Sequence, residues 1–295
     1  MTNVQILILT ISIISLFVVG IPLLCGILLP IFKPTISKKT NRYLYAFSSG
    51  FFLIMSTVLF IGESKEHLDS YFNRQFPGNE IASKAIVASI LTSVVLFGLL
   101  LSVGFKYFFA RTKGETEIHT HNHDKMIFNI SDYNPKSKAF AIFFLLTHRI
   151  PDGLIIGLLC SSIAHGDFNV VNIVFLCSFV IHIFPEELII YYRQIDMGIK
   201  RKKAIINSLI AISLVIPLII IGSIIGWFSL ENEIAIHIVQ LIAASFLLFI
   251  SIVEFLPEFL HDQKMVGKSW YTTILIFIIG IGSGLFILCF HDHSH

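Results

Sequence analysis

The sequence has few charged residues for its length. Of its 295 residues only 14% are Asp, Glu, Lys or Arg, whereas 55% are apolar. Soluble domains carry about 25% charged residues, because their surface faces water. This scarcity excludes a cytosolic enzyme, a disordered chain and a basic arm that binds nucleic acid. Four cysteines without a CxxC spacing also exclude a disulfide scaffold. The composition therefore predicts a protein whose solvent is the lipid bilayer.

Long apolar stretches recur along the whole chain. A membrane helix needs about 20 apolar residues to cross about 30 Å of hydrocarbon. Uninterrupted apolar runs favour helices, since the strands of a membrane barrel alternate apolar and polar residues. The stretches that qualify are residues 4–31, 43–62, 84–109, 139–161, 170–192, 204–228, 236–257 and 271–290. We therefore expect an all-α membrane protein with eight transmembrane helices, in which residues 1–295 form a single polytopic membrane domain.

The Lys and Arg residues divide unevenly between the two sides of the membrane. Most of the 21 lie in loops on one side, whereas the other side holds only Lys65, Arg74 and Lys84, and Arg149 falls inside an apolar stretch. Cytoplasmic loops are enriched in Lys and Arg. We therefore expect a multi-pass protein of the cell membrane with both termini outside the cytoplasm and a cytoplasmic loop at residues 110–138.

Stretches 43–62 and 236–257 match each other at a constant offset. The identical pairs are Phe51/Phe246, Leu53/Leu248, Ser56/Ser251, Val58/Val253, Phe60/Phe255 and Glu63/Glu258. By the loop charges the two stretches cross the membrane in opposite directions. Such inverted repeats are typical of secondary transporters, which bind their substrate near mid-membrane. Chance identity between apolar segments is the other explanation, and the sequence leaves both open.

Two motifs place ionisable residues inside the membrane. His148-Arg-Ile-Pro-Asp152 lies in the fourth stretch and His182-Ile-Phe-Pro-Glu186 in the fifth. Buried ionisable residues are costly in hydrocarbon and therefore indicate function. In each motif the histidine and the acid are four residues apart, on one helix face. If the two helices face each other, two imidazoles and two carboxylates form a mixed nitrogen and oxygen site that suits Zn²⁺ and accepts Fe²⁺, Mn²⁺ or Cd²⁺.

Arg149 and Glu187 lie beside these predicted ligands and have two interpretations. They form a buried ion pair that offsets the desolvation of both charges, or Arg149 is a fixed positive charge beside the metal site. In the first motif Pro151 and in the second Pro185 lack an N–H, which frees a carbonyl one turn earlier, near Thr147 and Ile181. Such backbone is tolerated in a membrane only where protein or a hydrated cavity satisfies it.

Further polar clusters follow the ends of the apolar stretches. They are an outer cluster with Glu63, Glu66 and His67, an inner cluster with Glu254, Glu258 and His261, and the histidines His119, His121 and His123 of the cytoplasmic loop. The outer cluster predicts a metal entrance and the inner one an exit path, and histidines in a loop capture soft cations weakly. Polar helix ends at the headgroups and a solvated loop are the alternative explanations.

Together with Val253-Glu-Phe-Leu-Pro-Glu258, the two motifs resemble the ZIP family of divalent-metal transporters, over roughly residues 43–290. The resemblance implies a bundle in which helices 1–3 and 6–8 form an inverted repeat around helices 4 and 5. It also implies transport of Zn²⁺ toward the cytoplasm, with His148, Asp152, His182 and Glu186 as the first metal site.

The sequence departs from the family pattern beside these ligands. Arg149 stands where the family usually has Asn, Ile183 stands where it often has a polar residue, and the sixth stretch has no carboxylate. These departures predict a single metal site, with the Arg149 guanidinium in place of a second metal. They also leave open a metal sensor that does not transport. An intramembrane zinc hydrolase is a third reading, although we expect no enzyme, and whether the chain forms a homodimer stays open.

Overall fold

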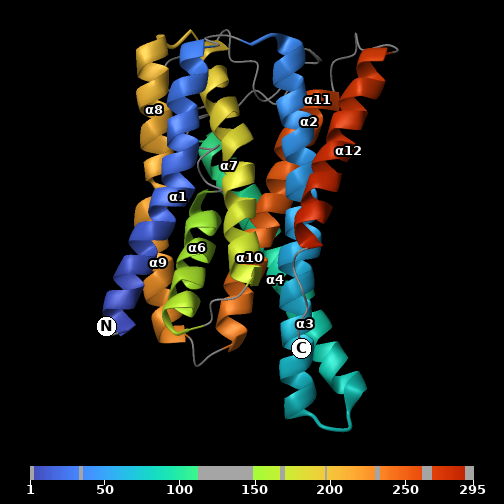
Figure 1. Cartoon of the computed structure of the whole chain (residues 1–295). Helices are drawn as coiled ribbons and strands as arrows, with labels where there is room; N and C mark the ends of the chain where they lie inside the picture. The colour runs from blue at the N-terminus through green and yellow to red at the C-terminus, as the bar shows by residue number, and fades with distance from the viewer. Residues whose placement is uncertain are drawn as a thin grey trace.

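The computed structural model describes residues 3–32, 36–111, 149–166, 170–196, 198–229, 233–260 and 268–289. These ranges contain helices and no strands, as the long apolar stretches predict. The α-helices are α1 (Asn3–Phe32), α2 (Lys38–Ile54), α3 (Gly62–Gln75), α4 (Glu80–Arg111), α6 (Arg149–Ala164), α7 (Val170–Asp196), α8 (Arg201–Ser213), α9 (Val215–Ser229), α10 (Glu233–Phe249), α11 (Leu256–Leu260) and α12 (Lys268–Leu288). The π-helices η1 (Met55–Ile61) and η3 (Ile250–Phe255) join α2 to α3 and α10 to α11. Figure 1 shows a bundle of long helices that run side by side.

Each predicted stretch contains a helix, and the described residues contain 6 helices that are long and apolar enough to cross a membrane. Helix α6 is described over 16 residues, from Arg149 onward, and several side chains of α7 are not described. The chain is therefore a multi-pass helical membrane protein, and the count of eight stays a prediction.

The helix that begins at α2 is longer than the predicted stretch 43–62. It continues through η1 and α3 to Gln75, and its span Lys39–Gln75 covers 37 residues. At 1.5 Å per residue this is about 55 Å, against about 30 Å of hydrocarbon. Helix α3 and the start of α4 accordingly protrude from one end of the bundle (Figure 1). Residue 62 marks the point where apolar residues give way to polar ones, and the helix does not end there.

The two π-helices occupy matching positions of the suspected repeat. Both η1 and η3 lie in the stretches that match at a constant offset, and Ser56 and Ser251 fall inside them. A π-turn is rare and marks a local interruption of the α-helical ladder. The Ser251 hydroxyl donates to the carbonyl of Ser49 at 2.8 Å and the Ser49 hydroxyl donates to the carbonyl of Ser251 at 3.0 Å. These two bonds hold η3 against α2.

Glycines allow two helix pairs to approach closely. In α6 and α9, a Cβ atom added at Gly157 or Gly222 would collide with the backbone of the facing helix. A Cβ atom added at Gly50 of α2 or Gly280 of α12 would also collide with the facing backbone. Small residues at such contacts are typical of membrane helices, where close van der Waals packing replaces the hydrophobic effect. The pairs α6–α9 and α2–α12 therefore form rigid parts of the bundle.

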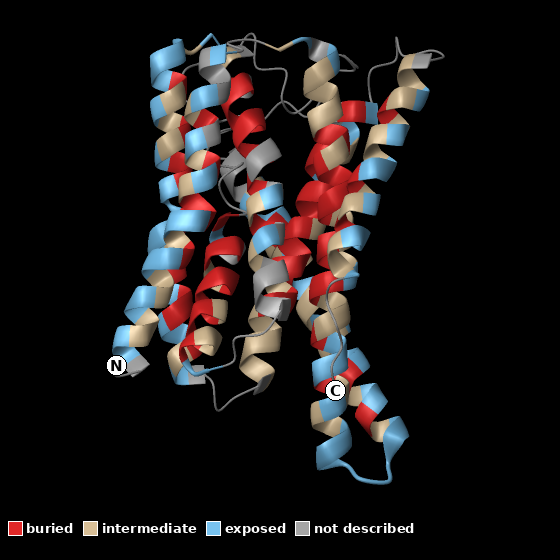
Figure 2. Ribbon diagram, in the orientation of Figure 1, coloured by how far each residue is buried: buried red, intermediate tan, exposed pale blue. Residues whose placement is uncertain are grey.

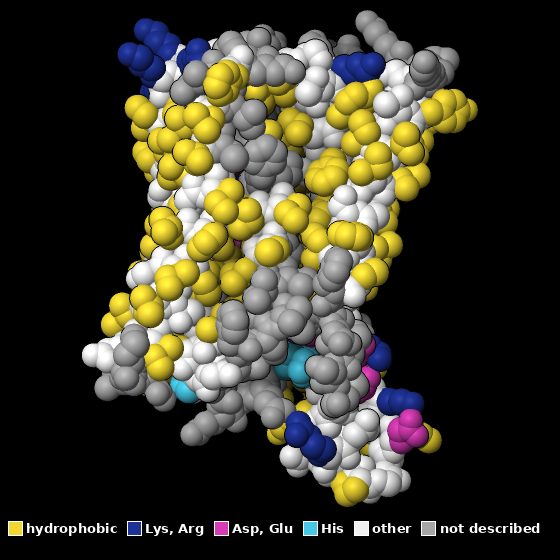
Figure 3. Space-filling view, in the orientation of Figure 1, with side chains coloured by type: hydrophobic (Ala, Val, Ile, Leu, Met, Phe, Trp, Pro, Cys, Tyr) yellow, Lys and Arg dark blue, Asp and Glu magenta, His cyan; other side chains and the backbone are white. Residues whose placement is uncertain are grey.

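The burial pattern is the one expected for a bundle in lipid. Buried residues gather in the middle of the bundle, and the outward faces of the peripheral helices are exposed (Figure 2). Those faces are apolar, as at Leu16 and Phe17 of α1, which are 70% and 58% exposed. Lys and Arg side chains collect at the upper end of the bundle, where α2 and α8 begin (Figure 3). Helix α1 begins at the opposite end (Figure 1).

Candidate functional site

The buried charges at the centre of the bundle come from α6 and α7. The described part of α6 starts at Arg149, about half-way up the bundle (Figure 1). Its side chain and those of Asp152, Glu186 and Glu187 are all at least 98% buried. Charges so far from water are stable only when they are paired and hydrogen-bonded. The four buried residues therefore indicate a functional site.

One guanidinium holds both glutamates of α7. Arg149 Nε lies 3.0 Å from Oε1 of Glu186, and Arg149 Nη2 donates to Oε2 of Glu187 at 3.3 Å. Of the two interpretations of Arg149, the ion pair with Glu187 is present. The contact between Arg149 and Glu186 was not predicted. It places the cation directly on Glu186, which is a predicted metal ligand.

The surroundings of the pair explain why it forms. Asp152 lies three residues after Arg149, one turn along α6 and on a similar face. On the far side α1 packs against Glu187, and a Cβ atom added at Gly26 would lie 3.2 Å from its Cγ. Arg149, Glu186 and Glu187 thus form one buried cluster between α1, α6 and α7. Asp152 is a further buried acid on the same helix as Arg149.

The prolines of the two motifs lie in α6 and α7. Pro151 is two residues after Arg149, the first described residue of α6. Pro185 lies inside α7, which continues through it from Val170 to Asp196. The carbonyl of Ile181, one turn earlier, therefore lacks the usual helical donor, as the sequence predicts, whereas Thr147 lies outside the described residues.

The structure describes only part of the predicted central site. The carboxylates of Asp152 and Glu186 are on neighbouring helices and buried. His182 lies on α7 one turn before Glu186, but its side chain is not among those described, and His148 lies outside the described residues. Among the side chains that are described, no three His, Cys, Asp or Glu residues lie close enough to hold a metal ion. The four-ligand site stays a prediction.

The outer cluster extends onto a second helix. Gln240 of α10 donates to Oε2 of Glu63 at 2.8 Å, and its Oε1 lies 3.1 Å from Nδ1 of His237. The His237 ring stacks on that of His67, with 4.7 Å between the ring centroids. Glu63 and His67 therefore lie in one chain of contacts, and Glu66 is exposed on the same helix. These contacts link α3 to α10 with no cation among the groups that form them.

The inner cluster contains an ion pair. Nζ of Lys106 on α4 lies 2.6 Å from Oε1 of Glu254 in η3, and the Glu254 side chain is 2% exposed. Glu258 lies on α11 with its side chain not described, and His261 is outside the described residues. The loop histidines His119, His121 and His123 lie outside them as well.

Three residues of these clusters are missing from the sequence-based site. His237 and Gln240 are three residues apart in an apolar helix, and this spacing on one face is a signal that was available. Lys106 counts toward the cytoplasmic loop by charge alone, although it lies inside the stretch 84–109. Its partner is 148 residues away in the sequence, and no local pattern connects the two.

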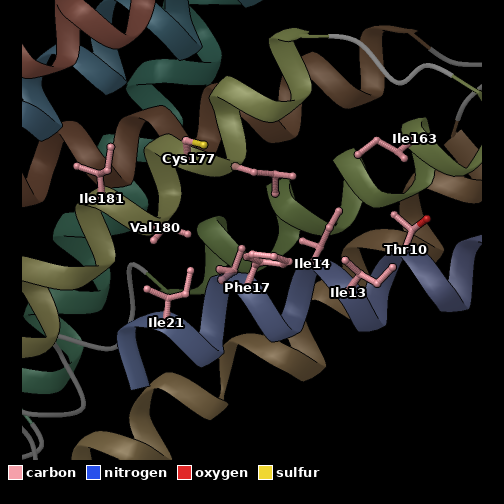
Figure 4. Close-up of a pocket in the computed structure, with 11 residues that line it drawn as sticks. Thr10, Ile13, Ile14, Phe17, Ile21, Ile163, Cys177, Val180 and Ile181 are labelled. Atoms are coloured by element: carbon pink, nitrogen blue, oxygen red, sulfur yellow. The ribbon is translucent and has the colours of Figure 1, made fainter. Parts of the chain in front are cut away.

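A groove between α1, α6 and α7 is not part of this polar path. It has a volume of about 630 Å³, and its wall includes Ile14 and Phe17 of α1, Ile163 of α6 and Val180 of α7 (Figure 4). The residues that line it carry no charge, and the Thr10 hydroxyl and the Cys177 thiol are their polar side-chain groups. A metal ion needs oxygen, nitrogen or sulfur ligands. The groove therefore offers an ion almost nothing.

Comparison with known proteins agrees with the site chemistry. The family model described as ZIP zinc transporter matches residues 110–289. The match includes α6, α7, α10 and η3, which contain the central cluster and Glu254, and it is narrower than the resemblance expected over residues 43–290. No curated protein matches the chain. The family transports divalent metal ions and is not a family of enzymes. Since the match covers more than half of the sequence, the chain belongs to the ZIP zinc transporter family.

Proposed function

We propose that this protein carries Zn²⁺ across the cell membrane toward the cytoplasm, through a site on α6 and α7 at mid-membrane. His148, Asp152, His182 and Glu186 are the proposed ligands. The observation that carries the proposal is the set of buried acids at the middle of the bundle, on two neighbouring helices that each bear a His-x-x-Pro-acid motif. A Zn²⁺ ion that loses its water there gains two carboxylates and two imidazoles, the ligand types it prefers.

We propose that one ion, and not two, occupies the site. The Arg149 guanidinium contacts both Glu186 and Glu187. A second divalent ion about 4 Å from this cation would be repelled by about 8 kcal/mol at an effective dielectric constant of 20. One carboxylate at the same distance would attract the ion by a similar amount, so the guanidinium cancels the attraction that Glu187 would otherwise offer a second ion. The guanidinium thus supplies the positive charge that a second metal would otherwise bring.

The polar clusters at the two ends define the rest of the proposed path. Glu63, Glu66 and His67 of α3 receive the ion from outside, together with His237 of α10, and Glu254, Glu258 and His261 release it inside. The orientation rests on the Lys and Arg residues at the end where α2 and α8 begin. The matching π-helices support an inverted repeat of helices 1–3 and 6–8 around the central pair, and such repeats rock to expose a fixed site alternately.

Uptake into proteoliposomes tests this function. The wild-type protein is expected to give saturable Zn²⁺ uptake, and Fe²⁺, Mn²⁺ or Cd²⁺ in the outer solution shows which other ions compete. Asp152→Ala, Glu186→Gln and His182→Ala are each expected to reduce the uptake at least about a hundredfold. Glu80→Gln is the matched control, since Glu80 is an exposed acid in an ion pair with Lys84 of its own helix. Intact uptake in Asp152→Ala and His182→Ala would show that the central site is elsewhere.

A metal sensor is the second candidate, and the contact between Arg149 and Glu186 favours it. A guanidinium that permanently holds a ligand carboxylate leaves a site that binds an ion without releasing it to the other side. This reading expects Zn²⁺ binding by the wild-type protein without flux, and flux in Arg149→Asn. If Zn²⁺ binding and Zn²⁺ flux in the wild-type protein saturate at the same Zn²⁺ concentration, the protein is a transporter and not a sensor.

A further inference from the structure

The ion pair between Lys106 and Glu254 lies inside the bundle and not at its surface. The Glu254 side chain is 2% exposed and that of Lys106 is 23% exposed. The ammonium also lies 5.7 Å from the centre of the Phe249 ring, where the ring electrons attract a cation. An aromatic face and a carboxylate together form a receptor for one positive charge.

The packing of α4 against α10 holds the two partners in register. Gly98 allows the closest approach, since a Cβ atom there would lie 2.6 Å from Cβ of Ser245. Two turns further along, the Phe105 and Phe246 rings are in contact, with 6.1 Å between centroids, and Lys106 meets Glu254. Because these contacts fix the backbones, the lysine side chain is the part of the pair that can move.

The ammonium has a second place to go. Lys106 lies five residues before Arg111, where α4 ends, which is about 7.5 Å along the helix axis. Lysine side chains near the end of a membrane helix extend toward the interface and keep their charge in water. A compact ammonium on a flexible stem leaves a carboxylate more readily than a guanidinium fork that contacts two acids.

We propose that Lys106 is an exit gate: its ammonium occupies the Glu254 carboxylate that a departing divalent cation has to bind. The inference rests on the proposed function and adds to it a residue that controls release and selectivity. A divalent ion that arrives from the central site displaces the ammonium, because its double charge is attracted more strongly to the carboxylate. The ammonium swings toward the cytoplasmic interface and returns when the ion has left. A monovalent ion has no such advantage over the lysine.

A purely structural role for the pair makes different predictions. An ion pair that only holds α4 against η3 would affect the amount of folded protein. It would leave Zn²⁺ binding and Zn²⁺ flux per folded molecule unchanged. A gate affects metal binding at Glu254 directly, and its effect depends on the strength of the competing cation. Lys106→Met removes the charge and keeps the approximate length of the side chain. Lys106→Arg keeps the charge but replaces the ammonium with a guanidinium, which can donate two parallel hydrogen bonds to a carboxylate.

The test measures two quantities in the purified full-length protein. The first is equilibrium binding of Zn²⁺ to each variant in detergent, and the second is Zn²⁺ flux in proteoliposomes per folded molecule. Lys106→Met is expected to bind additional Zn²⁺ or to bind it about tenfold more tightly, the effect of one ion pair to a buried carboxylate. Adding Glu254→Gln to this variant is expected to remove the gain. Lys106→Arg is expected to lower the maximal flux without a change in the amount of folded protein.

The controls separate this proposal from the proposed function. Lys84→Met is the matched control, since Lys84 lies on the same helix in an ion pair that is exposed to solvent. If the wild-type protein shows no flux, the transport proposal fails and the binding comparison still decides the gate. Equal Zn²⁺ binding by the wild-type protein and Lys106→Met overturns the gate, as does a gain that survives Glu254→Gln.

Discussion

Arg149 and Lys106 each place a cation against carboxylates inside the bundle, and the two cations differ in how firmly they are held. Arg149 is 1% exposed and contacts Glu186 and Glu187 with two nitrogens. Lys106 is 23% exposed and contacts Glu254 with one. A forked cation in a dry site is a fixed part of the structure, whereas a single ammonium near water is exchangeable. The difference indicates that a permanent positive charge determines how many metal ions bind at the centre. At the exit, the lysine ammonium and the metal ion compete for one carboxylate.

Removal of the fixed cation is expected to have the largest effect. Arg149→Met leaves Glu186 and Glu187 buried without their cation, and breaking such a pair costs about 3–5 kcal/mol of unfolding free energy. Thermal unfolding in detergent measures the loss. Zn²⁺ is expected to recover more stability in this variant than in the wild-type protein, because it replaces the lost charge and binds the folded state. Adding Glu187→Gln should restore part of the stability, and an unchanged melting temperature in Arg149→Met would mean that the pair contributes little.

Conversion of the fixed cation into an exchangeable one has a smaller expected effect. Arg149→Lys keeps the charge but loses the fork, so that one of the two glutamates loses its contact. We expect a loss of about 1–2 kcal/mol in unfolding free energy, as for one hydrogen bond to a charged group. The same variant is expected to bind Zn²⁺ several times more tightly at the central site, measured by equilibrium titration. Weaker binding than in the wild-type protein would remove the distinction between the two cations.

The sequence predicted the identity of these acids better than their partners. The spacing of four between histidine and acid placed Asp152 and Glu186 on their helix faces, and both are buried. That a residue is charged inside an apolar stretch is visible in one segment. Which residue it meets depends on the rotation and register of two helices that can be far apart in sequence. This is why the pairs of Arg149 with Glu186 and of Lys106 with Glu254 were not foreseen.

The fold shows the same limit. Apolar stretches predicted where helices occur, because hydrocarbon leaves the backbone no other partner than itself. They did not predict that the helix of α2 continues through η1 to Gln75, since polar residues beyond residue 62 form a helix as readily outside the membrane. The π-helices were also not predicted. They follow from a local surplus of one residue in the ladder, which apolar composition does not encode.

The outer end offers the smallest change and the most direct comparison with the exit, because Gln240 and not a cation holds Glu63 there. Gln240→Lys would install an ammonium at that carboxylate and make the entrance resemble the exit. The ammonium would compete with the arriving ion for the one carboxylate, so the half-saturating Zn²⁺ concentration should rise, about fivefold for a competing ion pair worth about 1 kcal/mol, with an unchanged maximal rate. Gln240→Leu removes the hydrogen bond without adding charge and serves as the control. A lower maximal rate in Gln240→Lys would indicate that a cation at the entrance also gates the transport cycle, and that the difference between the two ends lies in their partners and not in their mechanism.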